Sequence, residues 1–174
     1  MTATFQRPPA LRPQDRVAVI APASGFERGA FEAGLALLSA RYQAEYGGGL
    51  FERQRYLAGS DARRLAELHV ALADPDLRAV FCARGGYGAT RLLPELAALA
   101  PAGVPKPLVG FSDITALHLW LQAHGRCSIH GPVLTQLARL APSTCARLFA
   151  LLESAQPAAP LAAAAHRALC SRYW

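Results

Sequence analysis

The chain has 174 residues, 52% of them hydrophobic and 17% charged, which suits one globular domain and argues against disorder. No apolar run approaches the roughly 20 residues that cross a bilayer, so no membrane partner is expected. The N-terminal segment MTATFQRPPALRPQDRV has neither an apolar core nor a small-residue cleavage pattern, so no signal peptide is predicted. Without an export signal, the expected compartment is the cytoplasm.

The net charge of +6 comes from 18 basic and 12 acidic residues, and it raises the question of nucleic-acid binding. The arginines are scattered along the chain and form no basic stripe with interleaved aromatic residues. The sequence therefore predicts no nucleic-acid partner.

The four cysteines predict neither disulfides nor a metal site. They lie far apart, with no CxxC pair and no histidine at zinc spacing. Cys82 falls inside an apolar run and is expected to be a small buried hydrophobic residue. In a reducing compartment all four thiols are expected to be free.

Short apolar segments alternate with helical patterns along the chain. The apolar run 16–21 predicts a first strand, and the spacing of the leucines after Phe31 predicts a helix. Ser60 or Asp61 is expected to cap the second helix and Ser143 the last. The predicted strands cover 16–21, 43–46, 77–83, 108–111 and 127–130, and the predicted helices cover 31–42, 61–73, 90–98, 112–124 and 143–152.

This alternation predicts an α/β fold, with a parallel sheet covered by helices on both faces. In such sheets ligands bind beyond the carboxyl ends of the strands. Two turns of unusual composition follow predicted strands there, Arg84-Gly85-Gly86-Tyr87-Gly88 and Gly110-Phe111-Ser112-Asp113. They are the expected location of any chemistry.

The glycine-rich turn leaves two interpretations open. The dinucleotide fingerprint G-x-G-x-x-G fails because its sixth position is Arg91, and no Gly-Lys-Ser/Thr follows the turn. The glycines either allow a tight turn with positive φ or let backbone N–H groups approach an anion or an oxyanion.

The second turn resembles a nucleophile elbow, because Ser112 stands where a strand turns into a helix. The full pattern G-x-S-x-G is not met, since Ile114 replaces the second glycine, and a plain Ser/Asp helix cap is the alternative. A nucleophilic serine needs a base. His118 is expected to point away from Ser112, His130 is expected near the same edge of the sheet, and no complete triad can be assembled.

Several sequence blocks occur together and in order between Arg16 and Leu134. They are RVAVIAPAS, RYLAGSDARR, FCARGGYGATRLLPEL, KPLVGFSDITALH and IHGPVL. In these blocks the chain resembles the N-terminal half of the LD-carboxypeptidases. These are serine peptidases that include muramoyltetrapeptide carboxypeptidase and the microcin C immunity peptidase.

The resemblance implies a role for each motif residue. Ser112 would be the nucleophile, and the backbone N–H groups of Asp113 and Gly86, or Gly85, would form the oxyanion hole. Arg84, Gly85 and Tyr87 would contact the substrate. Arg84 would pair either with a substrate carboxylate or with a group of the protein itself. The glutamate and the histidine of the family's triad would come from a C-terminal domain. No cofactor and no metal are implied.

These inferences predict a nucleophile-bearing domain over 1–154, a linker or aberrant tail over 155–174, and an absent C-terminal domain. The function implied by the resemblance is release of the terminal D-amino acid from murein tetrapeptide during peptidoglycan recycling, with little or no activity from this chain alone. The alternative is a non-catalytic peptide-binding or interaction module, and a nucleotide-binding domain is a third, weaker interpretation.

The expected partners are a murein peptide and the missing domain, and a homodimer is left open. If that domain normally covers the serine, we expect Tyr87, Phe111 and the tail around Leu161 to be exposed and the chain to self-associate.

Overall fold

The computed structural model describes residues 5–156, which form a five-stranded, all-parallel sheet with the strand order β2-β1-β3-β4-β5. The predicted α/β fold is confirmed. The tail 157–174, on which the expectations for Leu161 and Cys170 depend, lies outside the described residues. The strands are β1 (Arg16–Ile20), β2 (Gln43–Glu45), β3 (Ala79–Cys82), β4 (Leu108–Gly110) and β5 (Ile129–His130).

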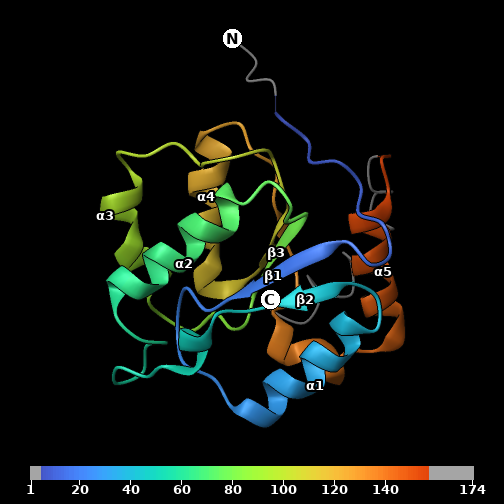
Figure 1. Cartoon of the computed structure of the whole chain (residues 1–174), viewed down its shortest axis with the longest axis horizontal. Coiled ribbons are helices and arrows are strands. Elements are labelled where there is room, and N and C mark those ends of the chain that lie inside the picture. Colours follow the sequence, from blue (N-terminus) through green and yellow to red (C-terminus); the bar gives the residue numbers. More distant parts are fainter. Residues whose placement is uncertain (1–4, 157–174) are drawn as a thin grey trace, which may run out of the picture.

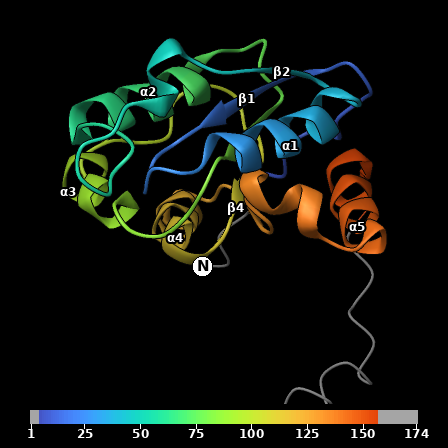
Figure 2. The ribbon, with the colours of Figure 1, turned by 90° about the horizontal axis from the view of Figure 1, so that it is seen from below.

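Helices cover both faces of the sheet, as Figures 1 and 2 show. Alternate residues of each strand point to opposite faces, so Val17 and Val19 join the core under one set of helices and Ala18 and Ile20 join the core under the other. The first core packs against α1 (Arg28–Ser39) and α5 (Pro142–Glu153). The second packs against α2 (Asp61–Ala73), α3 (Leu93–Leu96) and α4 (Thr115–Ala123).

The ends of several helices differ from those predicted. Ser60 does cap α2, but α5 begins at Pro142 after Ala141, so the predicted Ser143 cap is wrong; proline suits the first helical turn. The helix predicted over 90–98 is a 3-10 turn, η2 (Ala89–Leu92), followed by the single turn of α3. Pro94 has no N–H to donate and stops a continuous helix.

The structure also contains 3-10 turns that the sequence patterns did not predict. They are η1 (Gly48–Phe51), η3 (Ser112–Ile114), which precedes α4, and η4 (Leu134–Arg139). Strands β3 and β5 are shorter than predicted, because ladder pairing covers only part of each apolar run.

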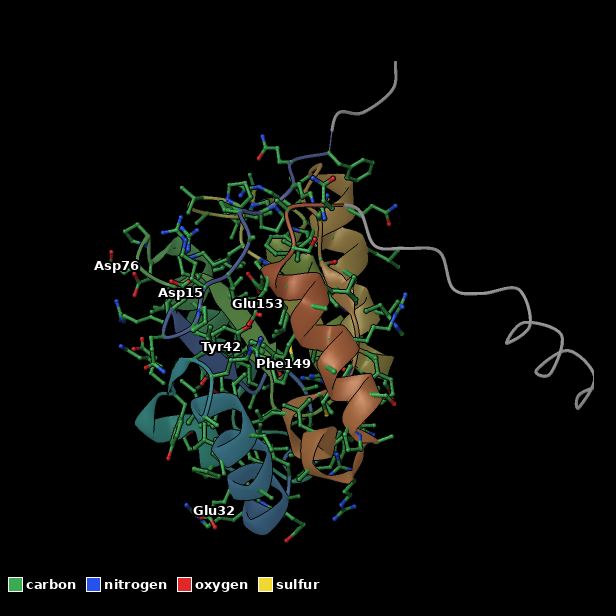
Figure 3. All side chains as sticks on the ribbon, turned by 90° about the vertical axis from the view of Figure 1, so that its right-hand side faces the viewer. Asp15, Glu32, Tyr42, Asp76, Phe149 and Glu153 are labelled. Carbon is green, nitrogen blue, oxygen red and sulfur yellow. The ribbon has the colours of Figure 1, made fainter. Side chains whose placement is uncertain are left out.

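Polar contacts join the end of α5 to the chain that follows α1, as Figure 3 shows from the side of α5. The Tyr42 hydroxyl donates to Glu153 Oε1 at 2.6 Å, and Arg41 forms an ion pair with the same carboxylate. The Phe149 ring lies 6.0 Å from the Tyr42 ring. The hydrogen bond from Arg41 lowers the pKa of Glu153. These contacts fix the end of α5 against the segment that joins α1 to β2.

A close backbone contact joins α1 to η4. A Cβ on Gly34 would lie 2.1 Å from the carbonyl oxygen of Leu134, so only glycine allows this backbone approach. Gly34 is buried in the middle of α1. The contact holds η4 against α1 and thereby positions the segment that follows β5.

We expect Gly34→Ala to destabilise the fold by about 2–4 kcal/mol, because the new methyl group would press on backbone that cannot move aside. Gly29→Ala is the matched control: it lies in the same helix, a Cβ there would have nothing within 4 Å, and it should stabilise by about 0.5–1 kcal/mol. Urea unfolding of both variants tests this. Equal stabilities would contradict the packing described here.

Within residues 5–156, no helix is both long and apolar enough to cross a membrane.

Candidate active site

The turns that follow β3 and β4 touch at the carboxyl edge of the sheet. The two strands are neighbours, with Val80 opposite Leu108 and Phe81 opposite Val109, so their ends are level. A Cβ on Gly85 would lie 2.9 Å from the Phe111 carbonyl oxygen and 3.1 Å from Ser112 Cβ. The glycine-rich turn and the serine turn are therefore parts of one site.

Ser112 has a backbone conformation that L-residues rarely adopt. Its φ is +63°, and it stands between extended Phe111 and the first turn of η3. A non-glycine residue in this region carries about 1–2 kcal/mol of strain, and such residues cluster at functional sites. The hydroxyl group caps no helix and makes no hydrogen bond with any residue in 5–156, so the plain-cap alternative is wrong.

The Asp113 carboxylate joins the two turns. Its Oδ2 accepts the backbone N–H of Ala89 at 2.6 Å, which ties the start of η3 to the end of the glycine-rich turn. Within the described residues, the backbone N–H groups of Gly86 and Asp113 have no acceptor. Two N–H donors are thus left unpaired beside the serine, as an oxyanion hole requires.

Ser24, in the loop after β1, holds the glycine-rich turn from the other side. Its backbone N–H donates to the Gly85 carbonyl at 3.2 Å, and its Oγ accepts the Tyr87 N–H at 3.0 Å. Gly86 has a φ of +97°, and a Cβ there would lie 2.4 Å from Ser24 Oγ. This close contact requires glycine at position 86.

A buried guanidinium supports the same turn from below. Arg64 has no exposed surface, and its Nη1 donates to the carbonyl oxygens of Pro22 and Gly88, the latter at 2.7 Å. Its Nη2 pairs with Asp61, which also binds Arg91. Arg64 therefore joins α2 to both loops. No sequence pattern predicted a role for Arg64, Ser24 or the Asp113 carboxylate, although Arg64 lies in the block RYLAGSDARR.

A cleft of about 380 Å³ opens beside Ser112. Arg84, Gly85 and Gly86 line it, and η4 forms the opposite wall. Arg84 is exposed and donates to the Gly25 carbonyl at 2.9 Å. The lining residues are Phe26, Glu27, Ala30, Arg84, Gly85, Gly86, Phe111, Ser112, Val133, Thr135, Gln136 and Arg139.

Two of the expected site residues do not line this cleft. Tyr87 is 45% exposed and packs edge-on against Tyr56, with ring centroids 5.6 Å apart. Asp113 lines a neighbouring apolar groove along α4, which Ser112 also borders. Tyr87 is exposed, as expected. Phe111 was also expected to be exposed, but it is half-buried.

Neither nearby histidine is positioned as a base for Ser112. His118 is buried, with Nε2 2.9 Å from the Gly110 carbonyl and Nδ1 2.8 Å from Ser128 Oγ. A neutral ring that donates from Nε2 and accepts at Nδ1 satisfies both contacts. His130 is exposed at the same edge, where it contacts the rings of Phe111 and His118. No imidazole in residues 5–156 is hydrogen-bonded to Ser112.

No group of three or more potential metal ligands occurs among the described residues. Cys82 is fully buried, and burial raises the pKa of its thiol. Cys82, Cys127 and Cys145 are free thiols.

We expect Ser112→Gly to be more stable than Ser112→Ala by about 1 kcal/mol, because glycine relieves the left-handed strain that alanine keeps. Thermal and urea unfolding of the two variants measure the difference. An alanine variant as stable as the glycine variant would mean that position 112 carries no strain.

Burial lowers the pKa of His118, so the folded state disfavours its charged form. The corresponding stability is present above the unfolded pKa, near 6.5, and is lost as pH falls below it. We therefore expect the unfolding free energy to decline from pH 7 to pH 5 by at most about 1.4 kcal/mol per pH unit from this group. His118→Gln should flatten that part of the profile. An unchanged slope would assign the decline to other groups.

Comparison with known proteins identifies relatives of this chain. The family model described as the LD-carboxypeptidase N-terminal domain matches residues 17–131. The chain is 46% identical over 125 residues to a murein tetrapeptide carboxypeptidase of Pseudomonas aeruginosa, covering 70% of this chain and 40% of that protein. It is 38% identical over 131 residues to a probable murein peptide carboxypeptidase of Bacillus subtilis, covering 74% and 41%.

Solved structures show the same fold. A muramoyltetrapeptide carboxypeptidase from Oxalobacter formigenes superposes with a TM-score of 0.70 at 29% identity, covering 80% of this chain and 48% of that one. An MccF-like protein from Bacillus anthracis gives 0.75 at 23% identity, covering 86% and 47%. The chain spans less than half the length of these relatives. On the family match, the chain belongs to the LD-carboxypeptidase family, in which it corresponds to the N-terminal domain.

Proposed function

We propose that this chain is the nucleophile-bearing half of a serine LD-carboxypeptidase that releases the terminal D-amino acid from murein tetrapeptide. The observation that carries the proposal is the strained Ser112, whose free hydroxyl lies against a turn with unpaired N–H donors. Relatives named as murein tetrapeptide and murein peptide carboxypeptidases support the choice of substrate. The proposed setting is peptidoglycan recycling in the cytoplasm.

In the proposed reaction, Ser112 Oγ attacks the carbonyl carbon of the last peptide bond and forms an ester as the C–N bond breaks. The serine proton passes through a base to the leaving amine, and water then hydrolyses the ester. The Asp113 and Gly86 N–H groups would donate to the oxyanion in each tetrahedral intermediate. Losing one such donor typically costs about 10²–10³ in rate.

Residues 5–156 place no base at Ser112. Both ring nitrogens of His118 are occupied, and His130 makes no hydrogen bond to Ser112. We propose that a histidine and a glutamate from the C-terminal half of the whole enzyme complete the triad. A homodimer is one arrangement that would cover the carboxyl ends of the strands, where Ser112 lies. The same missing base keeps open a second function, a module that binds peptide without hydrolysing it.

We expect the isolated chain to release D-alanine from murein tetrapeptide at no more than background rate, because loss of a triad base costs about 10⁴–10⁶ in rate. Joining residues 1–154 to the C-terminal half of the Pseudomonas aeruginosa relative should restore release. Amino-acid analysis of the product measures both.

Ser112→Ala in the chimera is the control and should return the rate to background. A chimera that stays active without the hydroxyl would refute Ser112 as the nucleophile. Full turnover by the isolated chain would show that it contains its own base, and an inactive chimera that still binds the peptide would favour the non-catalytic module.

A further inference from the structure

The wall of the cleft formed by η4 carries an arginine to which the proposed reaction gives no role. Arg139 is the last residue of η4, is exposed, and lines the cleft that Ser112 also lines. Thr135, on the same turn, donates from its N–H and its Oγ1 to the Ala83 carbonyl, at 3.1 and 3.0 Å. Arg139 is thus carried by a segment tied to the end of β3, next to the serine.

The charges in the cleft leave Arg139 uncompensated. Glu27 is the one carboxylate in the lining, and its Oε1 lies 3.4 Å from Arg53. Arg84 already donates to the Gly25 carbonyl. Within residues 5–156, the Arg139 guanidinium has no hydrogen-bond or ion-pair partner. Among the described residues, neither Arg84 nor Arg139 has an ion-pair partner, and Arg139 alone of the two has no hydrogen-bond acceptor. A carboxylate is the group that a guanidinium fork fits best.

We propose that Arg139 binds the free C-terminal carboxylate of the peptide and makes the site select for chain ends. This inference rests on the proposed function. In a substrate cut at its last peptide bond, that carboxylate belongs to the residue next to the scissile carbonyl, and neighbouring residues are about 3.8 Å apart between their Cα atoms. The carboxylate must therefore lie in the same cleft as Ser112. Arg84 remains available to orient the Gly25 loop.

The proposed role of Arg139 also explains why contacts from two different segments hold η4 in place. The Gly34 contact and the Thr135 hydrogen bonds fix the turn on both sides. A carboxylate site gains specificity when its donors are held before the ligand arrives. A peptide that continues beyond the cleavage point, or that ends in an amide, offers no negative charge to this position.

The test is calorimetric titration of the chain with a murein tetrapeptide and with its C-terminal amide. We expect the acid to bind at least tenfold more tightly than the amide. Arg139→Gln should remove that preference while leaving the amide's affinity unchanged, and Arg139→Lys should keep part of it. Arg12→Gln is the matched control: it removes the same charge from an exposed arginine that precedes β1, at the opposite edge of the sheet, and should keep the full preference.

Two results would overturn this inference and leave the proposed function standing: an acid preference that survives Arg139→Gln, or one that Arg84→Gln abolishes instead. Equal binding of acid and amide by the unmodified chain would do the same. If neither peptide binds the unmodified chain, the Arg139 site is refuted, and the D-alanine assay of the chimera decides separately whether Ser112 is the nucleophile.

Discussion

Gly85 and Ser112 lie so close together, at the ends of two neighbouring strands, that a Cβ at position 85 would be 3.1 Å from Ser112 Cβ, and the candidate site depends on this close approach. It exists because β3 and β4 are adjacent and parallel, and their register brings the two strand ends side by side. The segments that follow the two strands therefore leave the sheet next to each other. A side chain at position 85 would press on the Phe111 carbonyl and on Ser112 and would push the turns apart. The spacing between the proposed nucleophile and the proposed oxyanion donors is therefore set by the pairing of β3 with β4.

The strained serine persists because its surroundings hold it in place. Asp113 is hydrogen-bonded to Ala89, Ser24 holds the backbone of Gly85 and Tyr87, and the buried Arg64 binds the Gly88 carbonyl. Each of these contacts joins segments that are far apart in the sequence. Together they supply the stabilisation that offsets about 1–2 kcal/mol of unfavourable backbone conformation. Strain held in this way keeps the hydroxyl exposed and leaves it without a structural partner.

The cleft has two sides with different tasks. The strand ends supply the serine and the N–H donors, whereas η4 supplies Arg139, the residue that we propose binds the ligand's carboxylate. The two sides are held together by the backbone approach of α1 to η4 at Gly34 and by the hydrogen bonds from Thr135 to the Ala83 carbonyl. His118, which lies beneath the same edge, serves the sheet: it bridges the Gly110 carbonyl and the Ser128 hydroxyl. Position near a nucleophile does not by itself make a histidine a base.

The elements with a strong local signal were predictable from the residues alone. Apolar runs ended by glycine or proline located the strands, Ser60 marked the start of α2, and the order of strands and helices predicted the parallel sheet. The sequence also located both turns of the site, because they follow predicted strands and lie in the blocks that resemble the LD-carboxypeptidases. The exact ends of β3, α3 and α5 were not predictable, since ladder pairing and the missing N–H of Pro94 set them.

The residues that complete the site are selected by long-range packing and were not predictable from local patterns. Arg64, Ser24 and Arg139 carry no local pattern that separates them from other arginines and serines. Their roles come from carbonyl groups and cleft walls that distant segments bring to them. Likewise, the left-handed backbone of Ser112 follows from packing between two turns. Local sequence sets the backbone conformation that a residue prefers, but long-range contacts can impose another one. At this site they hold the proposed nucleophile, Ser112, in a left-handed conformation that serine rarely adopts.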